Sequence, residues 1–258
     1  MIYISVVSHG HFDVINRINT LPSLAFNGIK VLVVDNIGEV ALKLYCEKYN
    51  LCYFFDGKRR GFGANNNLAF DYFSDKFDLG SEDSFICLNP DIIVSADSIF
   101  RLVYFSQESK SKLSTLNLYL DDNYEDCDQC IRKFPTFSDF FYSFIGYKND
   151  YIINKNDILD SKLYVDWCAG SFLCFNVNAY EDLKGFDERY FMYCEDIDIC
   201  YRFYKKFNEK VLFFKDIKGI HLRGLENRKV FSRHFYWHLK SIIRFVMMSR
   251  RFFKRTLF

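Results

Sequence analysis

Residues 185–202 are GFDERYFMYCEDIDICYR, and this stretch gives the first indication of both fold and chemistry. Its five carboxylates lie among aromatic and aliphatic side chains, whereas a solvated acidic surface would interleave them with Lys and small polar residues. Apolar residues at 197, 199, 200 and 203 recur at roughly helical spacing and predict an amphipathic helix. Glu195 and Asp196 would lie in its first turn, where the helix dipole favours anions. Such carboxylates can act as a general base, or as a charge pair that only stabilises the helix.

The composition of the 258-residue chain indicates one large α/β domain or one domain with an appendage. Half of the residues are hydrophobic and 19% are aromatic, which is enough for a sizeable core. The net charge of +1 is unevenly distributed. Residues 223–258 carry ten Lys and Arg against one acid, so they are +9 and residues 1–222 are −8. Such a basic segment is expected to meet an anionic surface.

The cysteines suit a reducing cytosol, because most of the nine lie in apolar runs. Cys127 and Cys130 form a C-x-x-C without a second pair at zinc-site spacing, so neither a zinc site nor a redox pair is indicated. Met1 leads directly into a strand-like run, and no apolar stretch reaches about 18 residues. We therefore expect no signal peptide, no membrane-spanning helix and a cytoplasmic location.

Strands and helices alternate at the start of the chain. Strand-like runs cover residues 1–8, 30–35 and 51–55, with helical stretches at about 13–26 and 40–49. This alternation predicts a parallel sheet with right-handed crossovers, whose ligands bind beyond the carboxyl ends of the strands. The polar residues that follow the first two strands are Ser8, His9, Asp35 and Asn36. Their convergence predicts a ligand site.

A glycine- and amide-rich run, RGFGANNNLA at residues 60–69, follows the third strand. It contains G-x-G, but Asn66 stands where a dinucleotide fingerprint needs its third glycine, and that fingerprint belongs after the first strand. A Rossmann dehydrogenase is therefore disfavoured. Small residues and amides that open a helix still suit a phosphate or sugar pocket. The alternative is a helix start with capping Asn residues.

The next buried strand, residues 84–88, ends in Asn89-Pro90-Asp91. Pro90 stops the strand and holds the following carboxylate in an extended or turn geometry. A carboxylate at such a tip, close to a diphosphate, is a natural ligand for Mg²⁺ or Mn²⁺. The alternative is an ordinary turn. A helix is expected at about 95–105.

The stretch from 109 to 158 carries the weakest pattern. An inner strand is expected at 113–120, and the acidic run Asp121–Asp128 is interpreted as a solvated loop. Phe134–Phe137 and Phe140–Tyr142 indicate an aromatic lining or a mobile flap.

Residues 164–175 predict a strand–turn–strand. Gly170 would let a sugar approach the backbone closely. Trp167, beside Asp166, could stack on a sugar ring, although a tryptophan in an apolar run is usually core. A last strand is expected at 210–214, followed by a Gly turn and His221. The tail from 229 onward is basic and amphipathic. It suits an anionic membrane surface, with a helix packed on the domain or a nucleic-acid arm as alternatives. No nucleic-acid motif accompanies it.

Taken together, these motifs resemble family 2 glycosyltransferases, and most of all the rhamnosyltransferase-like branch that builds bacterial surface polysaccharides such as O-antigen. The resemblance extends from Met1 to about His221, and four motifs agree in order. They are Asp35 at a strand end, Gly61 to Asn67, Asn89-Pro90-Asp91, and Asp166 through Asp198. The family's Asp-x-Asp is Asn-Pro-Asp in this chain, so only Asp91 matches its ligating carboxylate.

The resemblance implies a GT-A fold, an α/β fold with a mostly parallel central sheet flanked by helices. Its domain would cover residues 1–222, with a nucleotide-sugar half at 1–108 and an acceptor half at 109–222. Residues 223–258 would form a basic amphipathic C-terminal segment.

The implied reaction is the transfer, with inversion, of a sugar from a dTDP-, UDP- or GDP-linked donor to a glycan or lipid-linked acceptor. Rhamnose is one sugar that the resemblance suggests, and the reaction would take place at the inner face of the cell membrane. Asp196, with Glu195 as rival, would be the base. The residues implied in donor binding are Ser8, His9, Asp35, Asn36, Gly61, Asn67, Asn89 and Asp91. Those implied at the acceptor are Asp166, Trp167 and Gly170, and Asp91 and His221 would hold the metal. A nucleotide-sugar binding protein without catalysis and a nucleic-acid-binding protein are the alternatives.

Overall fold

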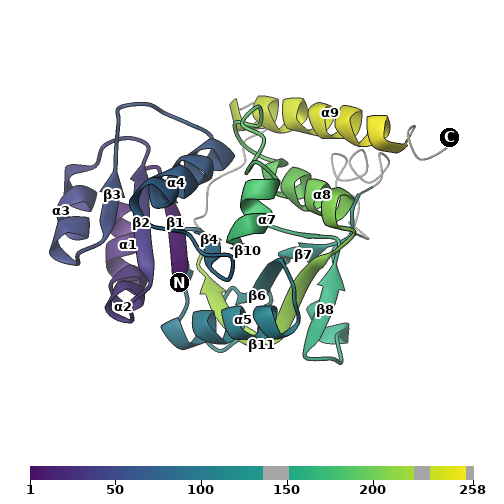
Figure 1. The fold of residues 1–258 in the computed structure, drawn as a ribbon, viewed down its shortest axis with the longest axis horizontal. Coiled ribbons are helices and arrows are strands. Elements are labelled where there is room, and N and C mark those ends of the chain that lie inside the picture. Colours follow the sequence, from purple (N-terminus) through teal and green to yellow (C-terminus); the bar gives the residue numbers. More distant parts are fainter. Residues whose placement is uncertain (136–150, 224–232, 254–258) are drawn as a thin grey trace.

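The computed structural model describes residues 1–135, 151–223 and 233–253 of the chain (Figure 1). Of the aromatic stretches predicted at Phe134–Phe137 and Phe140–Tyr142, residues 136–142 lie outside the described part. The strands are β1 Ile2–Ser8, β2 Lys30–Asp35, β3 Cys52–Phe54, β4 Ser84–Leu88, β5 Ile92–Ile93, β6 Leu113–Tyr119, β7 Ile131–Arg132, β8 Lys162–Val165, β9 Trp167–Cys168, β10 Phe172–Asn176 and β11 Val211–His221. The helices are α1 Phe12–Ile18, α2 Thr20–Phe26, α3 Val40–Lys48, α4 Phe62–Lys76, α5 Ala96–Glu108, the 3₁₀ turn Lys155–Asp157, α7 Val177–Asp182, α8 Glu195–Phe207 and α9 Arg233–Phe253.

A mixed, largely parallel sheet forms the centre of the molecule. Its strand order is β3-β2-β1-β4-β10-β6-β11-β5, with β8 paired to β11. The first four strands in this order are parallel, as predicted. β10 is antiparallel to both β4 and β6, and β6 is parallel to β11. β10 therefore joins the predicted nucleotide-sugar half to the predicted acceptor half in one sheet.

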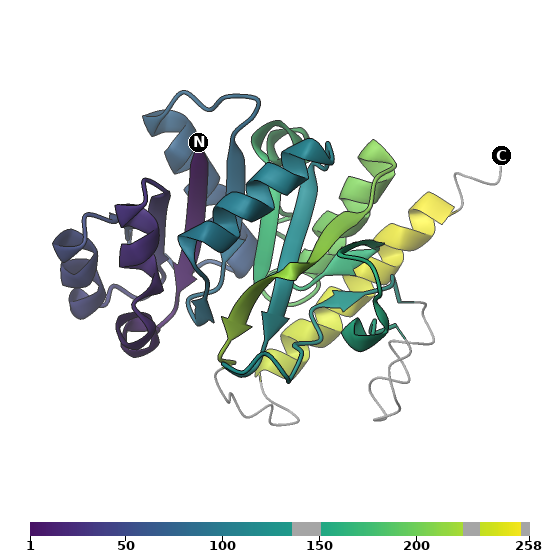
Figure 2. The ribbon, with the colours of Figure 1, turned by 90° about the horizontal axis from the view of Figure 1, so that it is seen from below.

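Helices cover both faces of the sheet. α5 lies on one face, and α4, α7 and α8 lie on the other (Figures 1 and 2). The packing of α4 is aromatic: the ring of Phe73 lies 5.0 Å from that of Tyr3 in β1 and 6.4 Å from that of Phe85 in β4. Burying each such side chain is worth about 1.5–3 kcal/mol. This packing fixes the start of α4 at the carboxyl ends of the parallel strands.

Two predicted elements differ from the structure. The helix expected at 13–26 is two helices, because Asn19 takes the left-handed conformation with φ 51° and breaks the hydrogen-bond ladder. The last strand, expected to end at Phe214, continues to His221 through an irregularity between Phe214 and Lys218. This extension places His221 directly opposite Ile92, the residue after Asp91.

Within the C-terminal segment, residues Arg233–Phe253 form an amphipathic helix, α9, which lies along α8 (Figure 1). Its inner side packs on the domain, with Ser241, Ile242 and Phe245 buried. The outer side exposes an apolar stripe of Tyr236, Leu239, Ile243 and Met247. Within the described residues, no helix combines the length and apolar character needed to cross a bilayer.

Candidate active site

Asp91 lies just beyond the carboxyl end of β4. The backbone N–H of Asn89 donates to the carbonyl of Ser171 at 2.9 Å, and the carbonyl of Asp91 accepts from Leu222 N–H at 3.1 Å. These bonds tie the Asn-Pro-Asp turn to β10 on one side and to the end of β11 on the other. As a result, Oδ1 of Asp91 lies 3.4 Å from Nε2 of His221. The structure thus brings together the two residues predicted as metal ligands.

His221 is held from behind by a carboxylate that the sequence interpretation missed. Its Nδ1 lies 2.6 Å from Oδ2 of Asp128, and Oδ1 of Asp128 pairs with the guanidinium of Arg223. Asp128 is only 2% exposed, so it does not belong to a solvated loop. Burial opposes ionisation, but these two partners outweigh it and lower the pKa of Asp128. Burial likewise opposes the charged imidazole, yet Asp128 and Asp91 raise the pKa of His221 to about 9.

The donor set around His221 fits a divalent ion that shares its coordination with substrate phosphates. No group of three or more His, Cys, Asp or Glu with metal-binding geometry occurs in the described part of the chain. Mg²⁺ and Mn²⁺ nevertheless need few protein ligands at phosphate sites, because waters and phosphate oxygens complete the shell. Asp91 and His221 Nε2 can supply two, and a carboxylate behind the other imidazole nitrogen is typical of metal-binding histidines.

Glu195 and Asp196 open α8, as predicted. The turn before them is strained, because Tyr193 and Cys194 both have positive φ, 70° and 63°. Asp196 is partly exposed, and its carboxylate accepts from Gly170 N–H at 3.2 Å and Ile197 N–H at 2.8 Å. Burial raises the pKa of Asp196, and burial together with Asp196 raises the pKa of Glu195. Both groups therefore hold a proton more tightly than ordinary carboxyls.

The two acids of this pair differ in access. Glu195 is 8% exposed, and its Oε2 has no hydrogen-bond partner among the described residues. The nearby Asp198 is buried and pairs with Arg202 at 2.7 Å, and Arg202 also donates to the carbonyls of Leu183 and Gly185. Asp198 thus secures the preceding turn, and Asp196 is the one of these three acids that is not buried.

A short backbone path links the acids at residues 91 and 196. Asp196 accepts from Gly170, and the adjacent Ser171 accepts from Asn89, two residues before Asp91. Gly170 has little room, because a Cβ there would lie 3.1 Å from the ring of Phe62 and 3.5 Å from Cβ of Asp196. The start of β10 therefore brings both acids to the same end of the sheet.

The four polar residues at the ends of β1 and β2 also gather here, but most of them bond within the protein. Asp35 is 3% exposed and accepts from Ile37 N–H, Glu39 N–H and the Tyr53 hydroxyl. Asn36 exchanges two hydrogen bonds with the backbone of Arg60. Ser8 is fully buried and accepts from His11 N–H, whereas His9 is exposed. These residues shape the strand-end loops, and contact with a nucleotide stays a prediction.

Gly61 and Asn67 hold the loop that leads to the acidic pair. A Cβ on Gly61 would lie 2.1 Å from the carbonyl oxygen of Phe191, so only glycine permits this approach. The amide nitrogen of Asn67 donates to the carbonyl of Phe186 and to Glu188, while its oxygen accepts from Phe186 N–H and Tyr180. Those four bonds fill the capacity of the amide, and a contact between Asn67 and the donor stays a prediction.

The predicted acceptor residues are largely used by the protein. Asp166 accepts from Phe134 N–H and pairs with Lys210 at 2.8 Å. The Trp167 ring is 6% exposed, donates to the carbonyl of Lys133, and is covered by the guanidinium of Arg132, 4.9 Å from its centroid. This geometry favours the alternative of a core tryptophan over a sugar-stacking one. Gly170 is the member of the set that contacts Asp196.

Two residues in this region went unnoticed in the sequence. Arg132, opposite Trp167 in the small β7–β9 sheet, lies close enough to Asp196 to favour its ionised form. Asp128 could have been found from alternation, because Asp128 and Cys130 are buried on either side of the exposed Gln129, immediately before β7. Because acidic residues surround these positions, the alternation of buried and exposed side chains is hard to recognise in the sequence.

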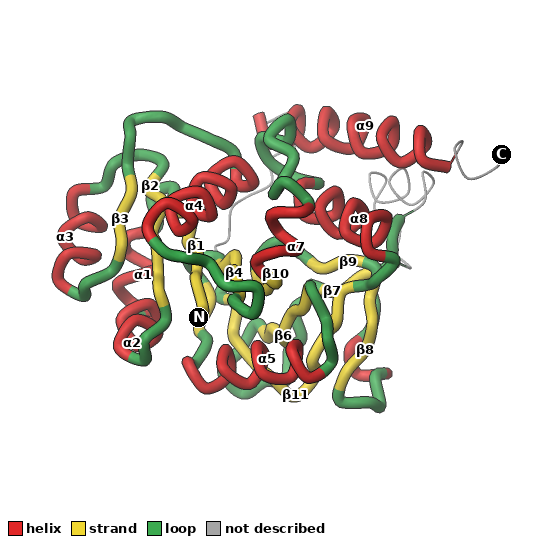
Figure 3. The backbone as a smooth tube through the Cα atoms, in the orientation of Figure 1, coloured by secondary structure: helices red, strands yellow, loops and turns green. Residues whose placement is uncertain are grey.

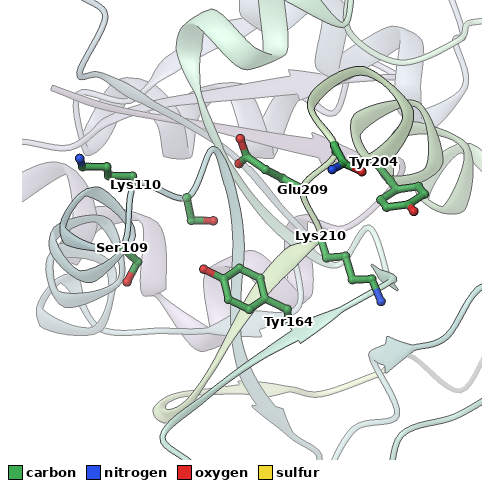
Figure 4. Close-up of a pocket in the computed structure, with 8 residues that line it drawn as sticks. Ser109, Lys110, Tyr164, Tyr204, Glu209 and Lys210 are labelled. Atoms are coloured by element: carbon green, nitrogen blue, oxygen red, sulfur yellow. The ribbon is translucent and has the colours of Figure 1, made fainter.

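A separate pocket lies at the opposite end of the sheet (Figure 4). It has a volume of about 430 Å³ and is lined by residues that precede β6 and β11, including Lys110, Glu209 and Lys210. Glu209 pairs with Lys112 and Lys210 with Asp166, so these charges are already compensated. None of the predicted site residues lines this pocket.

The fold is that of glycosyltransferases with the GT-A architecture. A crystal structure of GalNAc-T7 with UDP, GalNAc and Mn²⁺ aligns with a TM-score of 0.64 and 15% identity, covering 96% of this chain and 47% of that chain. The mannosyltransferase PcManGT from Pyrobaculum calidifontis, in complex with GDP-Man and Mn²⁺, aligns with a TM-score of 0.55 and 13% identity, covering 88% and 57%.

The sequence comparison gives the family. Rhamnosyltransferase WbbL from Escherichia coli (strain K12) is 37% identical over 250 residues, which are 97% of this chain and 94% of that protein. No family model matches the sequence. The chain belongs to the GT-A glycosyltransferase family that includes rhamnosyltransferase WbbL. The resemblance inferred from the motifs is confirmed.

Proposed function

We propose that this glycosyltransferase moves a sugar, with inversion, from a nucleoside-diphosphate sugar to a hydroxyl of a glycan or lipid-linked acceptor. One observation carries the proposal. Asp196, held by Gly170 N–H, and the Asp91–His221 pair are attached to the same short backbone segment at one end of the sheet. A base and a diphosphate-binding group at one end of the sheet are what a single displacement requires.

Asp196 acts in this proposal as the general base. It removes the proton of the acceptor hydroxyl as the oxygen attacks the anomeric carbon from the face opposite the leaving group. Burial raises the pKa of Asp196, which makes the carboxylate a stronger base than an exposed one. No nucleophilic residue is needed, because one displacement inverts the configuration.

Asp91 and His221 would hold Mg²⁺ or Mn²⁺ in this proposal. When bound, such an ion neutralises charge on the diphosphate leaving group. Asp91 contributes its carboxylate and His221 its Nε2, which face each other at 3.4 Å. The relatives whose structures hold Mn²⁺ support the choice of ion.

The similarity to a rhamnosyltransferase supports rhamnose as the transferred sugar. A panel of dTDP-, UDP- and GDP-sugars, assayed with and without Mn²⁺, tests both donor and cofactor. We expect transfer from one donor class, dependence on the ion, and product of inverted anomeric configuration by NMR. Retained configuration would refute the single displacement. Donor binding without transfer or hydrolysis would support a protein that has lost catalysis.

The outer side of α9 supports peripheral contact with an anionic membrane. Tyr236, Leu239, Ile243 and Met247 are 64%, 40%, 53% and 57% exposed and follow one another at helical spacing. The helix also carries Lys240 and Arg244. An exposed apolar stripe flanked by cations is typical of helices that lie on anionic bilayers. A lipid-linked acceptor would be reached at such a surface.

A further inference from the structure

The carboxylate of Asp128 divides its two oxygens between two cationic partners. Oδ2 lies 2.6 Å from Nδ1 of His221, and Oδ1 pairs with Arg223. The position of Asp128 is itself fixed, because its backbone N–H donates to the carbonyl of Leu118 in β6 at 3.0 Å. The Asp128 side chain is buried, so no water competes freely for these bonds.

A neutral imidazole carries its proton on one of its two nitrogens, and the hydrogen-bond partner of one nitrogen decides whether the other has a free lone pair. With its proton on Nδ1 and donated to Asp128, His221 presents the Nε2 lone pair on the other side of the ring, where Asp91 lies. Nε2 of His221 can act as a ligand only in this tautomer. Without the Asp128 carboxylate, nothing else in the described residues at hydrogen-bond distance from Nδ1 would select the tautomer.

We propose that Asp128 is a positioning residue that fixes the ring and tautomer of His221, so that Nε2 faces the metal and diphosphate site together with Asp91. This inference rests on the proposed function, because it presumes that Asp91 and His221 hold a divalent ion. Arg223 has a supporting part: its guanidinium pairs with Oδ1 of Asp128 and so helps to hold the carboxylate in place. Loss of the carboxylate that hydrogen-bonds a metal-binding histidine typically weakens metal binding 10–100-fold.

Mn²⁺ binding, followed by the EPR signal of the free ion with and without dTDP, UDP or GDP, tests this role on the full chain. We expect Asp128→Asn to weaken binding 10–100-fold and the exposed Asp126→Asn to leave it unchanged. His221→Ala sets the baseline for a lost ligand. An affinity of Asp128→Asn within threefold of wild type would overturn the proposal. Wild-type binding no tighter than that of His221→Ala would instead refute the metal site of the proposed function.

A second measurement does not depend on the metal. The chain has five histidines, so ¹⁵N-labelled imidazoles give a simple spectrum in which His221→Ala assigns the resonance of His221. At a pH where the ring is neutral, we expect the Nδ1–H tautomer in wild type and its loss in Asp128→Asn. An unchanged tautomer would overturn the proposal. Asp126→Asn, which changes an exposed acid two residues away, should keep the tautomer and controls for the loss of a nearby carboxylate.

Discussion

Carboxylates at one end of the sheet are held in opposite ways. Asp35 at the end of β2 accepts three hydrogen bonds from its own loop and from Tyr53, so its charge is used to build the turn. Glu195 and Asp196 lie side by side at the start of α8, where burial raises the pKa of both. The first arrangement stabilises the fold, and the second retains affinity for a proton. The difference separates carboxylates that stabilise the fold from carboxylates that are suited to proton transfer.

Asp196→Asn tests the carboxylate proposed for proton transfer, and we expect it to have the largest effect on activity. Loss of a general base typically reduces kcat by 10²–10⁴-fold. We expect the dissociation constant of the donor, measured by calorimetry, to stay near the wild-type value. The melting temperature should not fall, because the ionised form of a carboxyl whose pKa is raised on folding destabilises the folded state, and a neutral amide removes this cost. Full activity would place the base elsewhere. Asp182→Asn, an exposed carboxylate on α7, is the matched control.

Asp35→Asn should behave in the opposite way. An amide in place of the carboxylate turns one hydrogen-bond acceptor into a donor that faces other donors. Leaving a buried group unsatisfied costs about 1–3 kcal/mol. We expect the free energy of unfolding, measured with urea, to fall by that amount. Tyr53→Phe removes one of the three bonds and should cost less. If Asp35→Asn unfolds like wild type but loses donor affinity, Asp35 is a ligand rather than a support.

The sequence could predict the ends of strands better than it could predict the partners of side chains. Parallel strands bring their carboxyl ends to one edge, so the positions of Asp91, Ser8 and Asp35 follow from topology alone. The family resemblance places Asn67 at the donor, whereas its partners Phe186 and Glu188 are more than a hundred residues away in the sequence. Local pattern carries no information about such long-range bonds.

The extension of β11 shows a second limit. Lys215, Asp216 and Lys218 interrupt the apolar run after Phe214, and this polar stretch indicated the end of the strand. The strand instead passes through an irregularity and resumes pairing with β6 at Lys218. This detour brings His221 beside Asp91 and Asp128. The geometry of the proposed metal site therefore depends on an irregularity that periodicity does not reveal.

The pH dependence of transfer sharpens the comparison within the acidic pair. A base is active when ionised, so activity should fall as the pH drops through its pKa. Because burial raises the pKa of Asp196, the acid limb of kcat/KM should lie above the value of about 3.9 for an ordinary Asp. Glu195 holds its own proton more tightly than an ordinary Glu, so Glu195→Gln should leave the limb near its wild-type position while activity remains. Abolished activity in Glu195→Gln would reverse the roles of the two residues.

The two sides of α9 provide the last and smallest expected effect. The loop before α8 lies beside α9 (Figure 3). The inner side of α9 fixes this loop: Ser241 donates to the carbonyl of Met192, and the ring centroids of Trp237 and Phe191 are 4.7 Å apart. Deleting the helix would therefore disturb the base together with any membrane contact. Ile243→Glu and Met247→Glu alter only exposed positions. Each should weaken partitioning onto vesicles with anionic lipid roughly fivefold to tenfold, since burying such a side chain contributes about 1.5–3 kcal/mol and these are already half-buried.

Turnover of a short soluble acceptor analogue should be unchanged in both variants, because the inner side of α9 is intact. Leu159→Glu adds the same charge at a side chain that is 95% exposed and distant in sequence from α9, and it should leave vesicle binding as in wild type. Equal partitioning of all three variants and wild type would refute the proposed contact between α9 and an anionic membrane. Reduced turnover of the soluble analogue by Ile243→Glu would mean that the outer side of α9 also supports the loop that presents Asp196.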